Sequence, residues 1–131
     1  MKKDPNPLPP RPTDAELGIL KVLWSRGSST VRQVMDRLCE ERPTGYTTVL
    51  KLMQIMTEKR LVLRDESQRS HVYRAAFSEG QTQRQLVGHL LDRAFGGSAR
   101  NLVMQALSSH RASPQELEEI RELLDKIETA E

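Results

Sequence analysis

The feature that most constrains this chain of 131 residues is a change in the spacing of its apolar residues. From residue 13 onward, apolar side chains recur every three or four residues, which is the spacing of amphipathic helices. At residues 61–64 and 71–75 this spacing gives way to two short runs with β-branched and aromatic residues, separated by a polar stretch. The order predicts three short helices, a two-stranded hairpin and then further helices.

Capping signals mark where the first three helices begin. Thr13 and Glu16 form a capping box, and Thr30 with Gln33 repeats it before the second helix. Thr44 is expected to cap a third helix that runs to about residue 59. The apolar stripes of these helices predict a shared core, to which they contribute Ile19, Leu20, Leu23, Trp24, Val31, Val34, Met35, Leu38, Cys39, Val49, Leu52, Met53 and Met56.

Three helices followed by a hairpin form the winged helix-turn-helix arrangement, whose third helix can enter the major groove of DNA. This domain is expected over residues 13–77. Residues 1–12 are rich in proline, which predicts an extended, flexible tail without helix. The expected fold class is mainly α, with a winged helix-turn-helix followed by a helical dimerisation domain over residues 78–131.

The second domain is expected to contain three more helices. Ser78 with Gln81, and Ser113 with Glu116, form capping boxes. About 50 residues in short helices bury too little surface to be stable alone, which predicts that two chains interleave as a homodimer. The alternative is that this segment folds back on the first domain. The apolar face expected to form the dimer contains Leu86, Val87, Leu90, Leu91, Phe95, Leu102, Val103, Leu107, Leu117, Ile120, Leu124 and Ile127.

The charge is divided unevenly between these two parts. Residues 1–77 contain 14 Lys and Arg against 9 Asp and Glu, whereas residues 78–131 contain 6 against 9. A basic first part favours an anionic partner, with double-stranded DNA as the leading candidate. Basic residues that are merely solvated would give the same count, so the charge alone leaves both interpretations open.

Residues with hydrogen-bonding side chains lie opposite the apolar stripe of the third helix. Lysine can donate to guanine, glutamine can pair with adenine, and threonine can contact phosphate or a thymine methyl group. The returning strand of the hairpin and the approach to the helix could contact the DNA backbone. An exposed helix face of the same composition is also common without DNA. The candidate DNA-binding residues are Arg42, Thr44, Tyr46, Thr47, Thr48, Lys51, Gln54, Arg69, Ser70 and His71.

The sequence offers no residues for catalysis or for a cofactor. His71, His89 and His110 are far apart and lack metal-ligand spacing, and phosphate-binding loops and nucleophile elbows are missing. We therefore expect no enzyme activity, no metal and no cofactor. Cys39 is the one cysteine and is expected to be a small buried apolar residue. No apolar stretch approaches the roughly 20 residues of a membrane span, and a cytoplasmic protein is expected.

Three runs of sequence carry a family resemblance: PTDAELGILKVLWSRGSSTVRQVMDRL, GYTTVLKLMQIMTEKRLV and SHVYRA. Over residues 13–127 the chain resembles the penicillinase-repressor family, the BlaI/MecI/CopY group. The resemblance implies a homodimer with an amino-terminal winged helix and a carboxy-terminal dimerisation domain, which binds a palindromic operator and represses transcription. Members that control β-lactam resistance are inactivated when a membrane-embedded sensor metalloprotease triggers their cleavage, which implies such a protease as a partner.

The chain departs from the family pattern at three places. Gln105 and Ala106 stand where the family has its Asn-Phe cleavage site, so cleavage between them is a candidate only. No cysteine follows Cys39, which excludes copper sensing through a carboxy-terminal cysteine cluster. Arg60 stands where the family usually has glycine, and a side chain in a left-handed helix end would cost about 1 kcal/mol or require a different turn.

Two other functions remain open from the sequence. A winged helix can serve as a protein-interaction module without specific DNA binding. A repressor of this shape could also sense a small molecule at the dimer junction, which nothing in the sequence supports or excludes.

Overall fold

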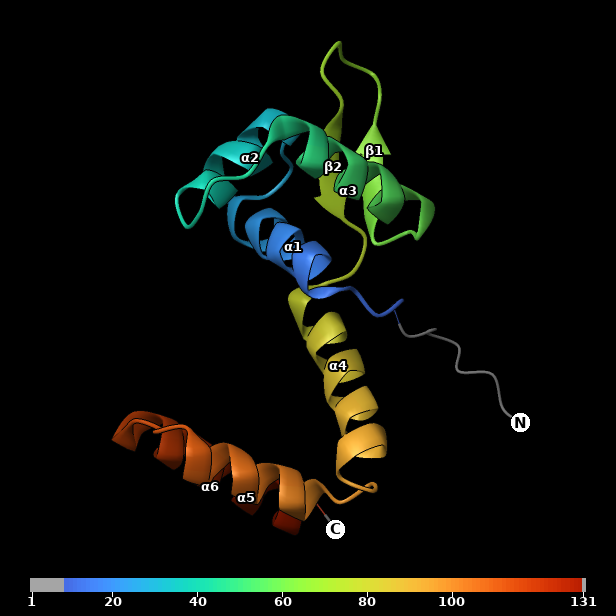
Figure 1. Cartoon of the computed structure of the whole chain (residues 1–131). Helices are drawn as coiled ribbons and strands as arrows, with labels where there is room; N and C mark the ends of the chain where they lie inside the picture. Colours follow the sequence, from blue (N-terminus) through green and yellow to red (C-terminus); the bar gives the residue numbers. More distant parts are fainter. Residues whose placement is uncertain (1–8, 131) are drawn as a thin grey trace, which may run out of the picture. The chain divides into compact units, whose positions relative to one another are not determined.

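The computed structural model describes residues 9–130 and contains, within them, six helices and one antiparallel hairpin (Figure 1). This mainly helical architecture with a small hairpin confirms the predicted fold class. The contacts divide the chain into two compact units, one up to Gly88 and the other from His89. The elements are α1 (Asp14–Arg26), α2 (Val31–Cys39), α3 (Tyr46–Glu58), β1 (Val62–Asp65), β2 (Val72–Ala75), α4 (Glu79–Ala94), α5 (Ala99–Ser109) and α6 (Pro114–Thr129).

The predicted capping boxes begin α1, α2 and α6. At α1 the backbone N–H of Glu16 donates to Thr13 Oγ1 (3.2 Å), and the backbone N–H of Thr13 donates back to Glu16 Oε1 (2.8 Å). The same reciprocal bonds begin α2 and α6, and Ser78 and Gln81 exchange them at the start of α4. Each box satisfies two backbone donors that a helix start would otherwise leave without partners.

The core of the first unit is formed by α1, α2, α3 and the hairpin. Most residues of the predicted stripes contribute to it, and Leu61, Val62 and Tyr73 close it from the hairpin side. Trp24 packs against this core, and its indole Nε1–H donates to the carbonyl of Phe77 at 3.0 Å, which ties α1 to the exit of the hairpin. The buried apolar residues are Ile19, Leu20, Val22, Leu23, Val31, Val34, Val49, Met53, Met56, Leu61, Val62 and Tyr73.

Two expectations about the turn between α2 and α3 were wrong. Gly45, not Thr44, occupies the N-cap of α3, and no side chain caps this helix. The hydroxyl of Thr44 donates to the carbonyl of Arg42 instead (3.1 Å). Cys39 is exposed rather than buried, because it is the last residue of α2, where the helix has run past the core. Its Sγ–H donates to the carbonyl of Thr44 at 3.2 Å.

The end of α3 shows that Arg60 adopts the left-handed conformation and does not require a different turn. Arg60 has a φ of 64°, and it is the one residue other than glycine with positive φ in the described part of the chain. The backbone N–H of Leu61 donates to the carbonyl of Met56 (2.9 Å), and that of Arg60 donates to Thr57 (3.1 Å). This is the Schellman helix end, with arginine at the position that usually holds glycine. The turn therefore keeps its shape, and Arg60 adopts the left-handed conformation despite its side chain.

The hairpin pairs β1 with β2 antiparallel, with Val62 opposite Ala75 and Asp65 opposite Val72. The loop that joins the strands projects beyond α3 (Figure 1). A third segment extends this small sheet, because Ser29 and Tyr73 exchange backbone hydrogen bonds of 2.9 and 2.8 Å. Ser29 is buried, and its hydroxyl donates to the carbonyl of Gly27. The base of the hairpin is thereby fixed to the segment between α1 and α2.

Only the end of the proline-rich segment lies within the described residues. Residues 9–12 form neither helix nor strand, in agreement with their proline content. Pro9 and Pro12 are nevertheless buried. These last residues of the expected tail are therefore packed against the fold, whereas residues 1–8 lie outside the described part.

Candidate nucleic-acid interface

The outer face of α3 carries polar side chains that no other element covers. Val49, Met53 and Met56 are 0% exposed and hold the helix against the core. The residues that alternate with this stripe point away from it, on the opposite face of the helix. Ile55 and Glu58 are exposed, as are all five residues that the sequence pattern selected on this helix: Tyr46, Thr47, Thr48, Lys51 and Gln54.

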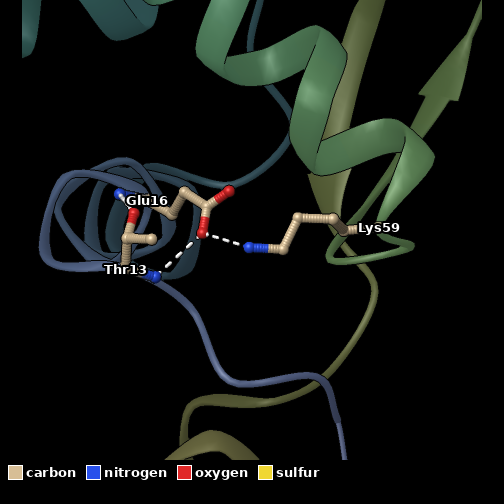
Figure 2. A network of polar contacts seen from close by, with 3 residues as sticks. All are labelled: Thr13, Glu16 and Lys59. Carbon is tan, nitrogen blue, oxygen red and sulfur yellow. Dashed lines mark hydrogen bonds and ion pairs between the residues drawn. The ribbon is translucent and has the colours of Figure 1, made fainter.

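A partly buried ion pair fixes the other end of α3. Lys59, the residue after this helix, donates from Nζ to Glu16 Oε1 at 2.6 Å (Figure 2). Glu16 is only 2% exposed, and the same oxygen accepts the backbone N–H of Thr13. Burial raises the pKa of Glu16, but the bonds from Lys59 and Thr13 outweigh it and hold this pKa below its usual value. The pair joins the start of α1 to the end of α3, directly before the hairpin.

The hairpin forms the wing, and its predicted contact residues lie on the returning side. Arg69, Ser70 and His71 are all exposed. On the outgoing side Arg64 is paired with Glu66 at 2.7 Å. Asp65 accepts the backbone N–H of Ser67 (2.9 Å), and the hydrogen bonds from Ser67 lower the pKa of this carboxyl group. The charged side chains of the outgoing side are therefore bonded within the wing, whereas the returning side offers its basic residues to solvent.

A groove lies where the start of α2, the start of α3 and the returning wing meet. We call it the wing groove; its volume is about 260 Å³. Three of the predicted DNA-binding residues of the wing and one of α3 line it together. Its lining includes Thr30, Arg32, Tyr46, Arg69, Ser70 and His71.

Arg32 is the residue of this groove that sequence reasoning missed. Its guanidinium carbon lies 6.0 Å from the centre of the Tyr46 ring, at cation–π distance. Arg32 is in the first turn of α2 and 14 positions before Tyr46, so periodicity within one helix could not reveal the contact. The sequence did offer one signal for Arg32, namely its place in the first turn of the second helix of a helix-turn-helix.

The remaining predicted contacts lie in the turn before α3. Arg42 is exposed, and Thr44 is half-buried with its hydroxyl bonded to the carbonyl of Arg42. They lie outside the wing groove. The turn is thus a second, separate group of candidate contacts.

The second half of the chain leaves its apolar stripes uncovered. None of the residues 83–130 is buried. Leu86, Leu91, Phe95, Leu102, Leu117 and Ile120 are half-buried. Eight other large apolar residues within residues 83–130 are from 39% to 56% exposed: Val87, Leu90, Val103, Met104, Leu107, Leu123, Leu124 and Ile127. The helices of this part therefore leave these apolar side chains exposed to water.

The segment of the candidate cleavage site is helical. Gln105 and Ala106 are exposed and lie within α5. The described residues contain no cluster of His, Cys, Asp and Glu that could hold a metal ion. No helix within residues 9–130 has the length and apolar character that crossing a membrane would require.

The three-helix core, the exposed face of its third helix and the basic returning wing define the class of winged helix-turn-helix transcription regulators. The model of the family described as penicillinase repressor matches residues 12–126. The chain belongs to this family, whose members are transcriptional repressors and not enzymes.

Individual relatives are distant but extend over nearly the whole chain. A transcriptional regulator BlaI of Mycobacterium tuberculosis is 29% identical, covering 88% of this chain and 83% of its own length. A penicillinase repressor of Staphylococcus aureus is 20% identical, over 86% of this chain and 90% of its own. A penicillinase repressor of Bacillus licheniformis is 22% identical, over 89% and 91%.

Proposed function

We propose that this repressor acts in the cytoplasm as a homodimer on palindromic operator DNA. Each subunit inserts α3 into a major groove, and the wing contacts the flanking backbone. Two-fold symmetry sets the spacing of the half-sites, as it does in other dimeric helix-turn-helix proteins. An operator that overlaps a promoter is then closed to RNA polymerase while the dimer is bound.

The main observation in support of this proposal is the exposed polar face of α3. Lys51 and Gln54 are one turn apart and exposed, and both can address base edges in the major groove. Thr47 and Thr48 lie in the first turn, where helix-turn-helix proteins make most of their base contacts. The basic returning wing supplies charge for the phosphates beside them.

The uncovered apolar stripes support the homodimer. Helices that leave this much apolar surface in water are unstable unless a partner covers it. A second copy of the same chain is the simplest partner, since self-complementary surfaces associate with two-fold symmetry. The repressor relatives extend over the same region, so the surface belongs to the shared part of the family.

For induction we propose cleavage between Gln105 and Ala106, triggered by a membrane sensor metalloprotease. Proteases cut extended chain, so the middle of α5 must open first. An 11-residue helix with no buried residue has little to hold it closed outside a dimer. Cutting there would separate α6 from the rest of the dimer surface and release the DNA.

Selection of genomic fragments tests the DNA-binding proposal and identifies the operator in the same experiment. Purified protein is mixed with sheared genomic DNA at several salt concentrations, and the bound fragments are sequenced. Enrichment of a palindromic sequence near promoters, bound by two chains per site in a gel shift, is the expected result. Retention of DNA without any enriched sequence would indicate the interaction module instead, because specific binding exceeds non-specific binding by roughly 10³-fold or more.

A further inference from the structure

The wing groove gathers basic residues without any balancing acid. Arg32 from α2, with Arg69 and His71 from the wing, line it, and no carboxylate is among its lining residues in the described chain. Thr30, Tyr46 and Ser70, which carry hydroxyl groups, line it as well. Such a lining suits an anion that accepts several hydrogen bonds.

Two other arginines of the same unit form ion pairs, whereas the arginines of the groove do not. Arg37 is bound to Glu40 and Arg64 to Glu66. No ion pair joins Arg32 or Arg69 to an acid within residues 9–130. The groove therefore brings two arginines together near α3, with no acid among its lining residues to pair with them.

Arg32 is held over an aromatic ring rather than by an acid. Its guanidinium lies above Tyr46 (6.0 Å to the ring centre), which restricts its rotamers but keeps its charge. An arginine in a cation–π contact can still donate in its own plane, the geometry that binds phosphate with two hydrogen bonds. Tyr46 is also the first residue of α3, so a group bound by Arg32 lies beside the start of this helix.

We propose that the wing groove binds one backbone phosphate of the DNA, with Arg32 and Arg69 donating to it from opposite sides and Tyr46 orienting Arg32. This rests on the proposed function, since it requires duplex DNA along α3. Arg32 is then a phosphate-contacting residue that sets the depth of α3 in the major groove, and it reads no base. The binding energy it supplies is independent of sequence.

The test measures how affinity depends on salt for Arg32→Ala. Binding is followed by fluorescence anisotropy on two labelled duplexes, one carrying a selected genomic sequence and one a scrambled version of it. Loss of one phosphate contact should lower the slope of log K against log salt by about 0.9 on both duplexes. The ratio of the two affinities should remain that of the unchanged protein.

Two further variants separate charge from geometry. Arg32→Lys should restore the slope but regain only part of the affinity, because lysine offers a point charge without the stacked, two-pronged donor. In a double-mutant cycle with Tyr46→Leu, the effect of removing Arg32 should be smaller than in the unchanged protein. Additive effects would remove Tyr46 from the proposal.

Arg37→Ala is the matched control. Arg37 belongs to the same helix, is exposed, and lies outside the wing groove. Its loss should leave the salt slope unchanged. The urea midpoint of each variant, followed by tryptophan fluorescence, verifies that the fold is intact.

The outcomes distinguish this inference from the proposed function. An unchanged slope for Arg32→Ala, or a loss confined to the selected duplex, overturns the phosphate site even if the protein is a specific repressor. If the unchanged protein shows no preference for any sequence, the proposed operator function fails, while the slope on scrambled DNA still reports the phosphate contact. A protein that binds neither duplex overturns both.

Discussion

Replacing Arg60 by glycine should stabilise the winged-helix unit. Arg60 has a φ of 64° at the end of α3 and is exposed, so its side chain has no packing to lose. A left-handed residue with a side chain costs roughly 1–2 kcal/mol. Glycine removes this strain but loses about 0.5–1 kcal/mol more backbone freedom on folding. The net gain expected in the free energy of unfolding is about 0.5–1 kcal/mol.

Urea unfolding of the full chain at fixed concentration measures this gain. Trp24 is the single tryptophan, and its indole is bonded to the carbonyl of Phe77, so its fluorescence reports on this unit. The midpoint should rise while the slope m stays constant. In thermal unfolding, a gain of this size corresponds to roughly 2–8 °C for a domain of 60–100 residues.

Two other replacements at the same position test the reasoning. Arg60→Ala keeps a side chain at positive φ and should give no gain, whereas Arg60→Asn should fall between alanine and glycine, because asparagine tolerates this conformation better. If alanine stabilises as much as glycine, the gain comes from losing the charge or the long side chain, and the strain argument is refuted.

Three further predictions concern the base-reading face, the dimer and the partly buried ion pair. Lys51→Ala should lose about 1–3 kcal/mol on the selected operator and less on scrambled DNA; equal losses in anisotropy titrations would make Lys51 a phosphate contact. Leu124→Asp should give monomers in sedimentation and weaken operator binding, whereas a variant that remains dimeric would exclude this residue from the interface. Glu16→Gln should make the free energy of unfolding less dependent on pH in acid. Because the pKa of Glu16 is lowered in the fold, its carboxylate stabilises the fold at neutral pH, and this contribution disappears as pH falls below about 4.5 through the folded-state pKa. Urea midpoints at pH 7 and pH 3 measure it, and a variant as acid-sensitive as the original would contradict the role of the pair with Lys59.

The order and kind of the elements could be predicted from the sequence because their causes are local. Capping boxes such as Thr13 with Glu16 and Ser113 with Glu116 act within one helical turn, and the structure contains both. Apolar spacing placed Val49, Met53 and Met56 in the core and left the opposite face of α3 exposed. The family pattern marked Arg60 as anomalous, and its positive φ follows from the same local turn.

Tertiary structure decided what depends on residues distant in the sequence. Cys39 has the apolar spacing of its helix, yet it is exposed because the core ends before the helix does. Ser29 gives no strand signal, and only its pairing with Tyr73 turns it into a third β segment. Likewise, Glu16 is recognised locally as a cap, and only the packing of α3 on α1 brings Lys59 to it.

One part of the candidate interface could likewise be predicted from the sequence, and another part depends on tertiary structure. The exposed face of α3 is a property of one helix, so periodicity was sufficient to find it. The wing groove joins α2, α3 and the wing, and the cation–π contact of Arg32 with Tyr46 exists only once these elements are packed. On α3 the sequence was sufficient to show which side chains face outward, whereas tertiary packing decided which of them meet, because hydrogen bonds and charges act between groups that only folding brings together.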